Sequence, residues 1–377
     1  MTVLRFTGGH VVAADAVLGG VAITLAGDRI AALEAAAGGA GAIDLAGGWL
    51  MPGFVDTQVN GGGGVLFNNA ITVDAIAAIG AAHAAYGTTA FLPTLISEGP
   101  DRIAAALDAV DDAIAAGVPG VVGAHIEGPV LNPARKGIHD AARFQSLDPE
   151  LLALLTRPRR GRVMVTLAPE RTDPAAIAAL VAAGVIVSAG HSEASYPVAL
   201  AAFDAGLSGI THLFNAMPPM RQRDPGLVGA ALDDPRPWCG LIVDRVHVEP
   251  SVLRIALASR GTERMMLVTD AMSSVGAVDK DFVLQGRPIA VADGICRFAD
   301  GTLAGSDLDM ATAVANTVAD LRVAPAVAAR MAAANPAAFL GLAHERGSLS
   351  PGLRADWVQL DAAFRPVATW IGGERIA

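Results

Sequence analysis

Hydrophobic residues in the middle of the chain form short, nearly unbroken runs, and most of these runs are separated by alanine-rich stretches. Apolar runs of this length are typical of buried parallel strands, and the stretches between them are typical of helices. Eight such runs favour a closed barrel of eight strand–helix units over an open sheet. The runs cover residues 54–59, 88–92, 121–126, 163–167, 185–189, 209–213, 240–243 and 265–269, and helical stretches cover 73–86, 101–116 and 175–183.

The two ends of the chain show a different pattern, with shorter apolar runs between glycine-rich turns. Residues 21–25, 29–33 and 42–45 near the start, and 357–360 and 367–371 near the end, indicate short strands. We therefore predict an α/β fold with a small β-sandwich domain built from both termini, residues 1–51 and 346–377. Residues 52–345 are expected to form the (β/α)8 barrel, with an insertion around 271–303.

The insertion contains Asp293-Gly294, which is typical of a hairpin turn. We expect a helix after the insertion, because Ser306 and Asp309 match a capping box.

Composition and charge narrow the class of protein. Hydrophobic residues make up 53% of the chain and charged residues 17%, so a large buried core is expected. The net charge of −10 argues against nonspecific binding to nucleic acid, which needs a basic excess. Cys239 and Cys296 are too few for a structural zinc cluster or a disulfide scaffold. No apolar signal core or membrane-spanning run stands out, so we expect a soluble, cytoplasmic protein with no membrane partner.

Polar and ionisable residues stand at the ends of six of the eight predicted strands. In a barrel of this kind the carboxyl ends of the strands meet at one mouth, where catalytic groups lie. Unpaired buried charge is costly, so ionisable groups at buried strand ends indicate function. The residues are Asp56, Gln58, Asn60, His125, Glu127, His191, His212, Asn215, Asp244, Arg245, His247 and Asp270.

Glu127, His191 and His212 offer one carboxylate and two imidazoles, a donor set that suits Zn²⁺ and leaves one position for water. Bound zinc lowers the pKa of that water to about 7. Asp270, at the end of the eighth strand, can take the proton of the water and deliver it to a leaving amine. Taken singly, each histidine is better interpreted as a packing residue, but their joint position at strand ends favours a site. For His10, His83 and His344 we keep the packing interpretation.

A bound phosphate has two candidate positions in the sequence. Residues 61–64 are four glycines, but they lack the Lys-Ser/Thr that follows a phosphate-binding P-loop, so a tight turn is favoured there. The loops after strands six and seven carry Arg221, Arg223, Arg245 and His247, and arginine matches phosphate oxygens with two hydrogen bonds. For Arg221 and Arg223 ordinary surface solvation is an equal alternative.

Several motifs resemble the amidohydrolase superfamily and, within it, the family of N-acetylglucosamine-6-phosphate deacetylases. The resemblance covers nearly the whole chain, and the combination of the His-Ile-Glu-Gly-Pro and His-Leu-Phe-Asn-Ala-Met motifs is its most specific part. The motifs are Met51-Pro-Gly-Phe-Val-Asp56, His125-Ile-Glu-Gly-Pro129, Ser188-Ala-Gly-His191-Ser192, Thr211-His-Leu-Phe-Asn-Ala-Met217, Val268-Thr-Asp-Ala271, Phe91-Leu-Pro-Thr94, Lys136-Gly-Ile-His139 and Leu303-Ala-Gly-Ser306.

The resemblance implies a metallo-dependent hydrolase barrel that cleaves the acetamido group of N-acetylglucosamine 6-phosphate, giving acetate and glucosamine 6-phosphate in amino-sugar catabolism. It implies one divalent metal ion per subunit on Glu127, His191 and His212, with Zn²⁺ favoured and Fe²⁺, Co²⁺ or Mn²⁺ as alternatives. It also implies Asp270 as acid and base, and a homodimer whose interface completes the phosphate pocket. The implied substrate-binding residues are Ile138, His139, Asn215, Ala216, Arg223, Asp244, Arg245, Val246, His247, Leu303, Ala304 and Gly305, and His139 is also a candidate catalytic donor.

The sequence departs from the wider superfamily at the end of the first strand. Many amidohydrolases carry His-x-His there, whereas this chain carries Gln58-Val-Asn60. Neutral amides are poor zinc ligands beside imidazole. We therefore predict a single metal ion, with Gln58 and Asn60 orienting the water bound to it.

Three other functions fit parts of the sequence. Another amidohydrolase, acting on a cyclic amide or an N-acyl amino acid, would keep the metal and Asp270 without a sugar-phosphate pocket. A catalytically silent scaffold is disfavoured by the intact set of candidate catalytic residues. A sugar-phosphate binding protein would bind its ligand without a metal, so loss of turnover on chelation separates it from an enzyme.

Overall fold

The computed structural model describes residues 2–14, 16–36 and 39–377. Its central feature is an eight-stranded sheet in which each strand pairs in parallel with its neighbour in the sequence. The strands are β8 (Phe54–Val59), β11 (Thr88–Ile96), β12 (Gly123–Glu127), β13 (Arg162–Leu167), β14 (Ile186–Ala189), β15 (Gly209–Ile210), β16 (Trp238–Leu241) and β17 (Met265–Leu267). Each coincides with one of the eight predicted runs, so the predicted TIM-like barrel is confirmed.

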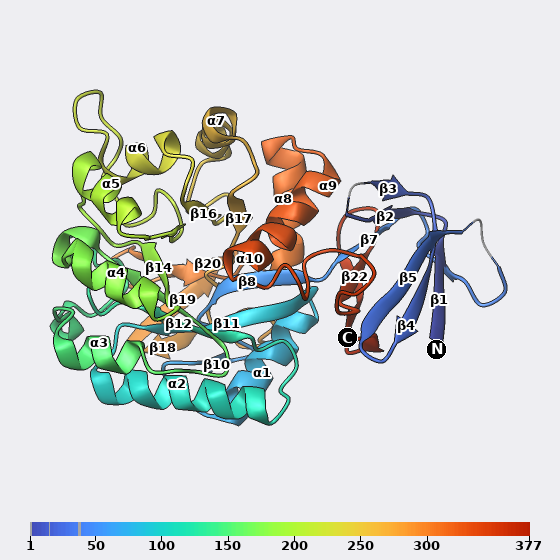
Figure 1. Ribbon diagram of the computed structural model, residues 1–377, viewed down its shortest axis with the longest axis horizontal. Coiled ribbons are helices and arrows are strands. Elements are labelled where there is room, and N and C mark those ends of the chain that lie inside the picture. Colours follow the sequence, from blue (N-terminus) through green and yellow to red (C-terminus); the bar gives the residue numbers. More distant parts are fainter. Residues whose placement is uncertain (1, 15, 37–38) are drawn as a thin grey trace.

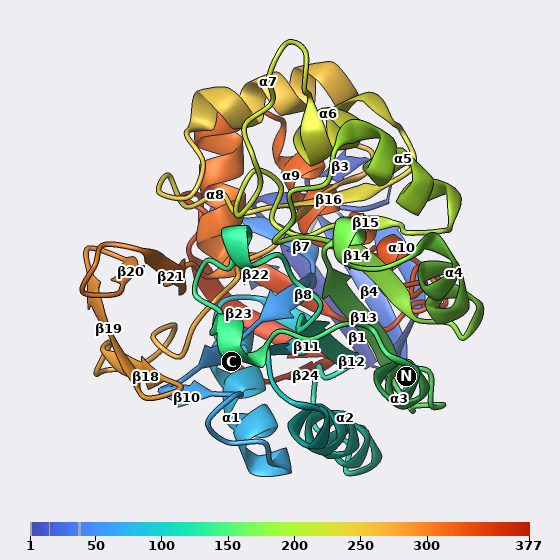
Figure 2. The same ribbon diagram turned by 90° about the vertical axis from the view of Figure 1, so that its left-hand side faces the viewer.

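The sheet closes between its first and last strands just beyond the end of β17. Val59 forms a parallel bridge with Ala271. The Asp270 amide donates to the Gln58 carbonyl at 3.1 Å, and the Asn60 amide donates to the Ala271 carbonyl at 2.9 Å. The closing seam therefore holds Gln58, Asn60 and Asp270 side by side at the mouth of the barrel, which Figure 2 views end-on.

Helices surround the barrel and pack their apolar residues against it. In α2, for example, the buried residues Ile103, Leu107 and Val110 recur at helical spacing. Helices α3 and α4 begin with proline after an aspartate cap, and the side chains of Asp148 and Asp173 accept from backbone amides. The helices are α1 (Val73–Ala84), α2 (Pro100–Ala115), α3 (Pro149–Leu155), α4 (Pro174–Ala182), α5 (Tyr196–Asp204), α6 (Gly226–Asp233), α7 (Pro250–Arg260), α8 (Met310–Leu321), α9 (Pro325–Ala332) and α10 (Ala334–Phe339).

The predicted capping box of Ser306 and Asp309 is wrong, because Ser306 is not the N-cap of α8. Asp309 is itself the N-cap, and its side chain accepts from the Thr312 amide. Ser306 instead ends a strand, where its hydroxyl donates to the Thr269 carbonyl at 2.6 Å. This hydrogen bond links the residues just after β17 to the segment that leads into α8.

Strands from both chain ends form two further sheets, which Figure 1 shows beside the barrel. Phe6 of the first sheet packs edge-on against Trp357 and Trp370 of the second, with ring centroids 6.1 and 6.0 Å apart. One apolar core is shared by both sheets, as expected of a sandwich. The sheet orders are β5-β4-β1-β6 and β24-β23-β22-β7-β2-β3. The strands are β1 (Thr2–Thr7), β2 (His10–Val12), β3 (Val17–Leu18), β4 (Val21–Ala26), β5 (Arg29–Ala35), β6 (Ile43–Asp44), β7 (Trp49–Pro52), β22 (Trp357–Leu360), β23 (Pro366–Ile371) and β24 (Glu374–Arg375).

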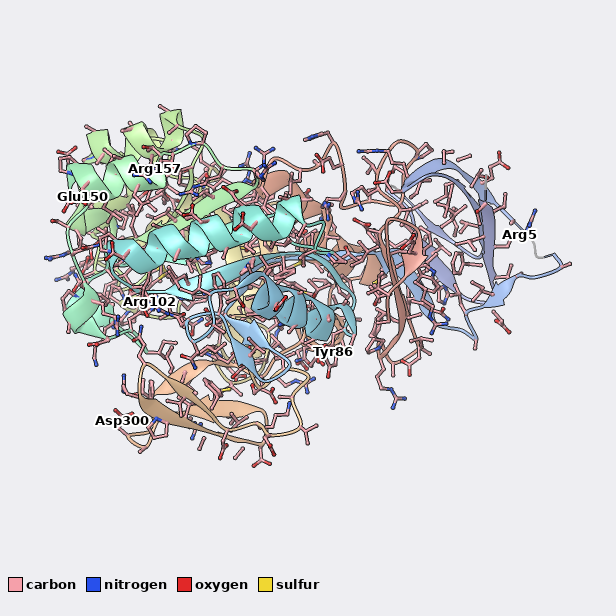
Figure 3. The ribbon with its side chains drawn as sticks, turned by 90° about the horizontal axis from the view of Figure 1, so that it is seen from below. Arg5, Tyr86, Arg102, Glu150, Arg157 and Asp300 are labelled. Carbon is pink, nitrogen blue, oxygen red and sulfur yellow. The ribbon has the colours of Figure 1, made fainter. Side chains whose placement is uncertain are left out.

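The segment after β17 forms a four-stranded antiparallel sheet, which is larger than the expected hairpin. Its turn at Asp293 and Gly294 has positive φ at both residues, as the Asp-Gly pair predicts. Its apolar side packs on Leu66, Ile96 and Met272 near the barrel mouth. Figure 3 shows this inserted sheet, which includes the loop residue Asp300, as a lobe on the side of the barrel. The strands are β18 (Phe282–Leu284), β19 (Arg287–Ala292), β20 (Ile295–Arg297) and β21 (Leu303–Ser306).

The four glycines after β8 form a tight turn, as the sequence predicts. Gly61 and Gly62 make strand β9, which pairs with β10 (Val65–Leu66). Gly63 and Gly64 have φ of 61° and 84°, values that favour glycine. Helix α1 begins only at Val73, so it does not start directly behind this turn. Among the described residues, no helix is both long and apolar enough to span a bilayer.

Candidate active site

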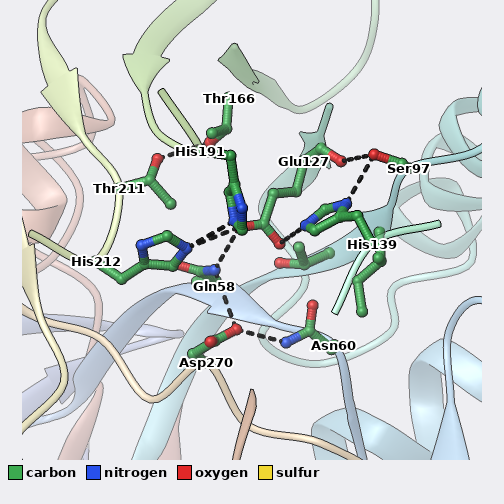
Figure 4. Close-up of polar contacts among 12 residues, drawn as sticks. Gln58, Asn60, Ser97, Glu127, His139, Thr166, His191, Thr211, His212 and Asp270 are labelled. Atoms are coloured by element: carbon green, nitrogen blue, oxygen red, sulfur yellow. Dashed lines mark hydrogen bonds and ion pairs between the residues drawn. The ribbon is translucent and has the colours of Figure 1, made fainter. Parts of the chain in front are cut away.

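The donor atoms of Glu127, His191 and His212 converge at the mouth of the barrel (Figure 4). Glu127 Oε1 lies 3.2 Å from His191 Nε2 and 3.1 Å from His212 Nε2, and the two Nε2 atoms are 3.1 Å apart. A tetrahedral zinc ion with bonds of about 2.0–2.1 Å would hold its ligands roughly 3.3 Å apart. The side chains are almost fully buried, so their spacing is set by the barrel.

The orientation of the His191 ring identifies which of its nitrogens is free for a metal. His191 Nδ1 lies 2.8 Å from the carbonyl oxygen of Arg135, which can only accept, so Nδ1 carries a hydrogen. In the neutral ring Nε2 then presents a lone pair toward Glu127 and His212. The Glu127 oxygen, the His191 lone pair and the His212 Nε2 atom face one spot, where a bound cation would contact all three. The donor set therefore fits the predicted metal ion.

Backbone strain is concentrated around this site. His191, His212 and Asp270 all have positive φ, at 49°, 33° and 53°, a region that non-glycine residues rarely adopt. Each follows the end of a barrel strand, where the turn aims its side chain into the mouth. Strain of this kind persists where the surrounding structure enforces it, and it is frequent at active sites.

His139 is a second candidate for the third donor. Its buried Nε2 lies 3.7 Å from Glu127 Oε2, and Glu127, His139 and His191 also form a group that could hold a cation. We favour His212, because its Nε2 is nearer to the carboxylate and also faces His191 Nε2 at 3.1 Å. His139 Nε2 has no hydrogen-bond partner among the described residues. Burial lowers the pKa of His139 to about 3, so its ring is neutral at physiological pH.

Two amide side chains hold Asp270 beside the candidate metal donors. Gln58 Nε2 donates to Glu127 Oε1 at 3.1 Å and to Asp270 Oδ1 at 3.0 Å, and Asn60 Nδ2 donates to the same Asp270 oxygen at 2.7 Å. Burial, and then the negative charge of Glu127, raise the pKa of Asp270 to about 6. Asn60 Oδ1 is buried and accepts no hydrogen bond from the described residues. Gln58 and Asn60 thus contact the carboxylates, and their role toward water stays a prediction.

A cavity of about 360 Å³ opens above these groups. Both predicted catalytic residues, Asp270 and His139, line it, together with Glu127 and His191. Part of the predicted substrate-binding set also lines it, namely Ile138, Asn215, Ala216, His247, Leu303 and Gly305. The inserted sheet therefore contributes one wall of the cavity, through Leu303 and Gly305 of β21.

Other members of the predicted substrate-binding set lie outside the cavity wall. Arg245 points to Asp320, with Nε 2.6 Å from Oδ2, and its side chain is 55% exposed. Arg223 is exposed in the loop before α6. Asp244 contacts His247, which lines the cavity. Its Oδ2 lies 2.6 Å from His247 Nδ1, and its Oδ1 accepts from the backbone amides of Val246 and His247. Val246 and Ala304 are also absent from the lining. In this chain alone, the arginines predicted to meet phosphate do not reach the cavity.

Three residues at the site are absent from the sequence-based prediction. Ser97, at the end of the second barrel strand, places its hydroxyl 2.7 Å from His139 Nδ1. Arg135 and Thr302 line the cavity. Ser97-Glu98 directly follows β11, so the strand-end rule could have found the serine. Arg135 and Thr302 lie in loops, where no periodic pattern marks them.

Comparison with known proteins agrees with this site. The model of the amidohydrolase family matches residues 49–376. N-acetylgalactosamine-6-phosphate deacetylase from Shewanella sp. (strain ANA-3) is 42% identical over 330 residues, which cover 88% of this chain and 84% of that protein. The crystal structure of N-acetylglucosamine-6-phosphate deacetylase from Pasteurella multocida is 33% identical, with a TM-score of 0.94 and 99% of both chains covered.

A second solved structure is an aspartate-to-alanine mutant of N-acetyl-D-glucosamine-6-phosphate deacetylase from Mycobacterium smegmatis, in complex with N-acetyl-D-glucosamine 6-phosphate. It is 36% identical, with a TM-score of 0.92, and all of both chains is covered. The family match runs from β7 through the whole barrel to the last strand of the β-sandwich, and it includes every residue of the proposed metal site. The chain belongs to the amidohydrolase family.

Proposed function

We propose that this protein is a metal-dependent deacetylase that hydrolyses the acetamido group of N-acetylglucosamine 6-phosphate to glucosamine 6-phosphate and acetate, in amino-sugar catabolism. The observation that carries the proposal is the convergence of the donor atoms of Glu127, His191 and His212, together with the cavity that Glu127, His191 and Asp270 line. The likeness to deacetylases of this substrate, at TM-scores of 0.94 and 0.92, supports it.

The catalytic roles follow from the groups that face the cavity. Glu127, His191 and His212 would hold a divalent cation, which would supply Lewis acidity to polarise a carbonyl and lower the pKa of water. Asp270 then removes a proton from the attacking water and returns it to the departing amine nitrogen, which leaves poorly as an anion. Gln58 and Asn60 hold the Asp270 carboxylate in place for both transfers.

His139 is assigned to a substrate oxygen. Its Nε2 is buried, faces the cavity and lacks a partner, and its Nδ1 lies 2.7 Å from the Ser97 hydroxyl. When Ser97 donates to Nδ1, the neutral ring carries its hydrogen on Nε2 and donates it to the acetyl oxygen or a sugar hydroxyl.

We expect one metal ion per subunit, with Zn²⁺ favoured. One carboxylate and two imidazoles are ligands that zinc prefers, although Fe²⁺, Co²⁺ and Mn²⁺ accept the same set. A second ion is disfavoured because the Gln58 amide already lies between the carboxylates of Glu127 and Asp270.

The phosphate end of the substrate is assigned to Asn215, the backbone of Ala216 and His247, all of which line the cavity. Arg223 is exposed and outside the cavity of its own chain, so a contact with phosphate requires a second copy. We therefore propose a homodimer in which the Arg223 of each subunit completes the phosphate pocket of the other. Cytoplasmic location is also part of the proposal, and the two free, buried cysteines accord with it.

N-acetylgalactosamine 6-phosphate is a second candidate substrate. The 42% identical relative is named for that sugar, which differs from N-acetylglucosamine 6-phosphate only in the configuration at C4. The metal site and Asp270 act at the C2 acetamido group, so they treat the two sugars alike. Discrimination between them must come from the cavity wall.

The test is amide hydrolysis by the metal-loaded enzyme, measured as kcat/KM: acetate release from both sugar phosphates, ring opening of a cyclic amide, and release of the free amino acid from an N-acyl amino acid. We expect turnover of an N-acetylhexosamine 6-phosphate that is lost on chelation. A clear preference for the galacto sugar would replace the first substrate by the second. Turnover restricted to the cyclic amide or the acylated amino acid would overturn the proposal.

A further inference from the structure

Arg135 is the residue on the cavity wall whose side chain carries a permanent positive charge. Arg135 is the last residue of the short 3-10 helix η1 (Pro133–Arg135), in the loop after β12, the strand that ends at Glu127. Its side chain is 30% exposed. Building on the proposed function, we propose that Arg135 binds the phosphate of the substrate within its own subunit. The anion it recognises is a phosphate monoester on a sugar that is also held at the metal site.

The position of Arg135 is built by hydrogen bonds on both sides. Its carbonyl oxygen accepts from His191 Nδ1 at 2.8 Å, so its backbone is tied to a metal ligand. Its Nε pairs with the carboxylate of Glu193, which lies two residues after His191. Arg135 therefore moves as one unit with the loop that carries His191.

A single carboxylate joins the two loops that hold this pair. Glu170 Oε1 accepts from Asn132 Nδ2 at 2.9 Å and from the Glu193 amide at 2.6 Å, and its Oε2 accepts from the Ser192 hydroxyl at 2.6 Å. Asn132 also caps η1 through the Ala134 amide. This network already restricts the loop that carries Arg135, so less conformational entropy is lost when Arg135 binds a ligand.

The guanidinium keeps unused donors that suit a phosphate. Only Nε is bonded to Glu193, and neither Nη atom of Arg135 donates to another described residue. Two parallel N–H groups match two phosphate oxygens, and this bidentate contact is stronger than one to a neutral group.

Charge balance in the cavity points to the same role. The proposed divalent ion offsets the carboxylates of Glu127 and Asp270 that line the cavity, whereas a phosphate would add up to two negative charges that this ion does not offset. Of the arginines predicted from the sequence, Arg245 is paired with Asp320 outside the cavity and Arg223 is exposed. Arg135 is thus the cation that a single subunit can offer beside His247.

The test compares wild type with Arg135→Ala and Arg135→Lys, all metal-loaded, on N-acetylglucosamine 6-phosphate and on unphosphorylated N-acetylglucosamine. We expect Arg135→Ala to lower kcat/KM for the phosphorylated sugar about 10- to 100-fold, mainly through KM, and to leave the unphosphorylated sugar within about twofold. Arg135→Lys keeps the charge but loses the paired donors, so it should recover part of the loss.

A matched control is Arg365→Ala, which removes an arginine that is 80% exposed and paired only with Asp361. Arg365→Ala should not alter the ratio of kcat/KM for the phosphorylated sugar to kcat/KM for the unphosphorylated sugar. An equal loss on both sugars for Arg135→Ala, or no loss, would overturn the phosphate contact. If wild type releases no acetate from either sugar, the proposed function itself fails, which is a distinct result.

Discussion

Gln58 and Asp270 are joined by a hydrogen bond of 3.0 Å across the seam where the barrel closes, and the same Gln58 nitrogen also donates to Glu127. A neutral N–H group thus separates two buried carboxylates at a point where a second cation could otherwise bridge them. We expect wild type to hold one tightly bound divalent ion per chain by elemental analysis after dialysis. Two tightly held ions would contradict this interpretation of Gln58.

Asp270→Asn should separate catalysis from metal binding. The substituted amide cannot accept a proton from water or return one to the amine, so we expect kcat to fall by about 10²–10⁴-fold. The three metal donors are unchanged, so metal content should stay near the wild-type value. Turnover close to wild type would refute the acid/base role, and loss of metal would mean that Asp270 is itself a ligand.

The two possible third donors can be distinguished by comparing His212→Asn with His139→Asn. His212 Nε2 lies 3.1 Å from Glu127 Oε1, whereas His139 Nε2 lies 3.7 Å from Glu127 Oε2. We expect His212→Asn to weaken metal affinity strongly in competition with a chelator. His139→Asn should retain the metal and lose turnover, and the reverse pattern would assign His139 as the ligand.

The sequence predicts the barrel well, because a buried parallel strand needs a continuous apolar run and each run ends where the chain must turn. The same logic located Glu127, His191, His212 and Asp270, whose donor atoms meet in the structure. It did not locate Ser97, although that serine also follows a strand, because its partner His139 lies in a loop of another unit. Such pairing depends on tertiary contacts that no local periodicity encodes.

The sequence-based prediction of site residues is also limited in the loops, because no periodic pattern shows where a loop side chain points. Arg245 follows a barrel strand, as Glu127 and His191 do, but its backbone turn directs it to Asp320, away from the cavity. Arg135 has no strand pattern to mark it, yet its carbonyl is fixed by His191. The sequence also predicts a hairpin after β17, where the structure has a four-stranded sheet. The short strands of this sheet pack on Leu66, Ile96 and Met272, and such tertiary contacts are not encoded in the local sequence pattern.

The shared phosphate pocket can be tested by mixing two impaired variants. Arg223→Ala keeps Asp270, and Asp270→Asn keeps Arg223. In a symmetric dimer with a shared site, each heterodimer regains one complete site, so random co-assembly should restore roughly a quarter of wild-type sites. Activity of the mixture no greater than the sum of the separate variants would place Arg223 outside the partner's pocket, as would a monomer in solution.

Asp56 offers a stability prediction that is independent of the reaction. It is fully buried at the closing seam, where its Oδ2 accepts from the Thr269 hydroxyl at 2.5 Å and its Oδ1 accepts from the Gln58 amide at 3.2 Å. Burial raises the pKa of Asp56 from 3.8 to about 7, even though these hydrogen bonds lower it. Between these two values the folded protein holds more protons at Asp56 than the unfolded chain, so this group's contribution to stability falls as the pH rises from about 4 to about 7.

Asp56→Asn removes that proton linkage while keeping the shape of the side chain and an oxygen that accepts from the Gln58 amide. We therefore expect the free energy of unfolding of the variant, relative to wild type, to increase from pH 5 to pH 8. Urea unfolding of both metal-loaded proteins at the two pH values measures this difference, and groups common to both proteins cancel in it. A difference that does not change with pH would show that Asp56 is ionised in the folded protein throughout this range. The Thr269 hydroxyl and the backbone amides of Gln58 and Thr269, which also donate to Asp56, would then be sufficient to stabilise a buried negative charge at the seam that positions Asp270.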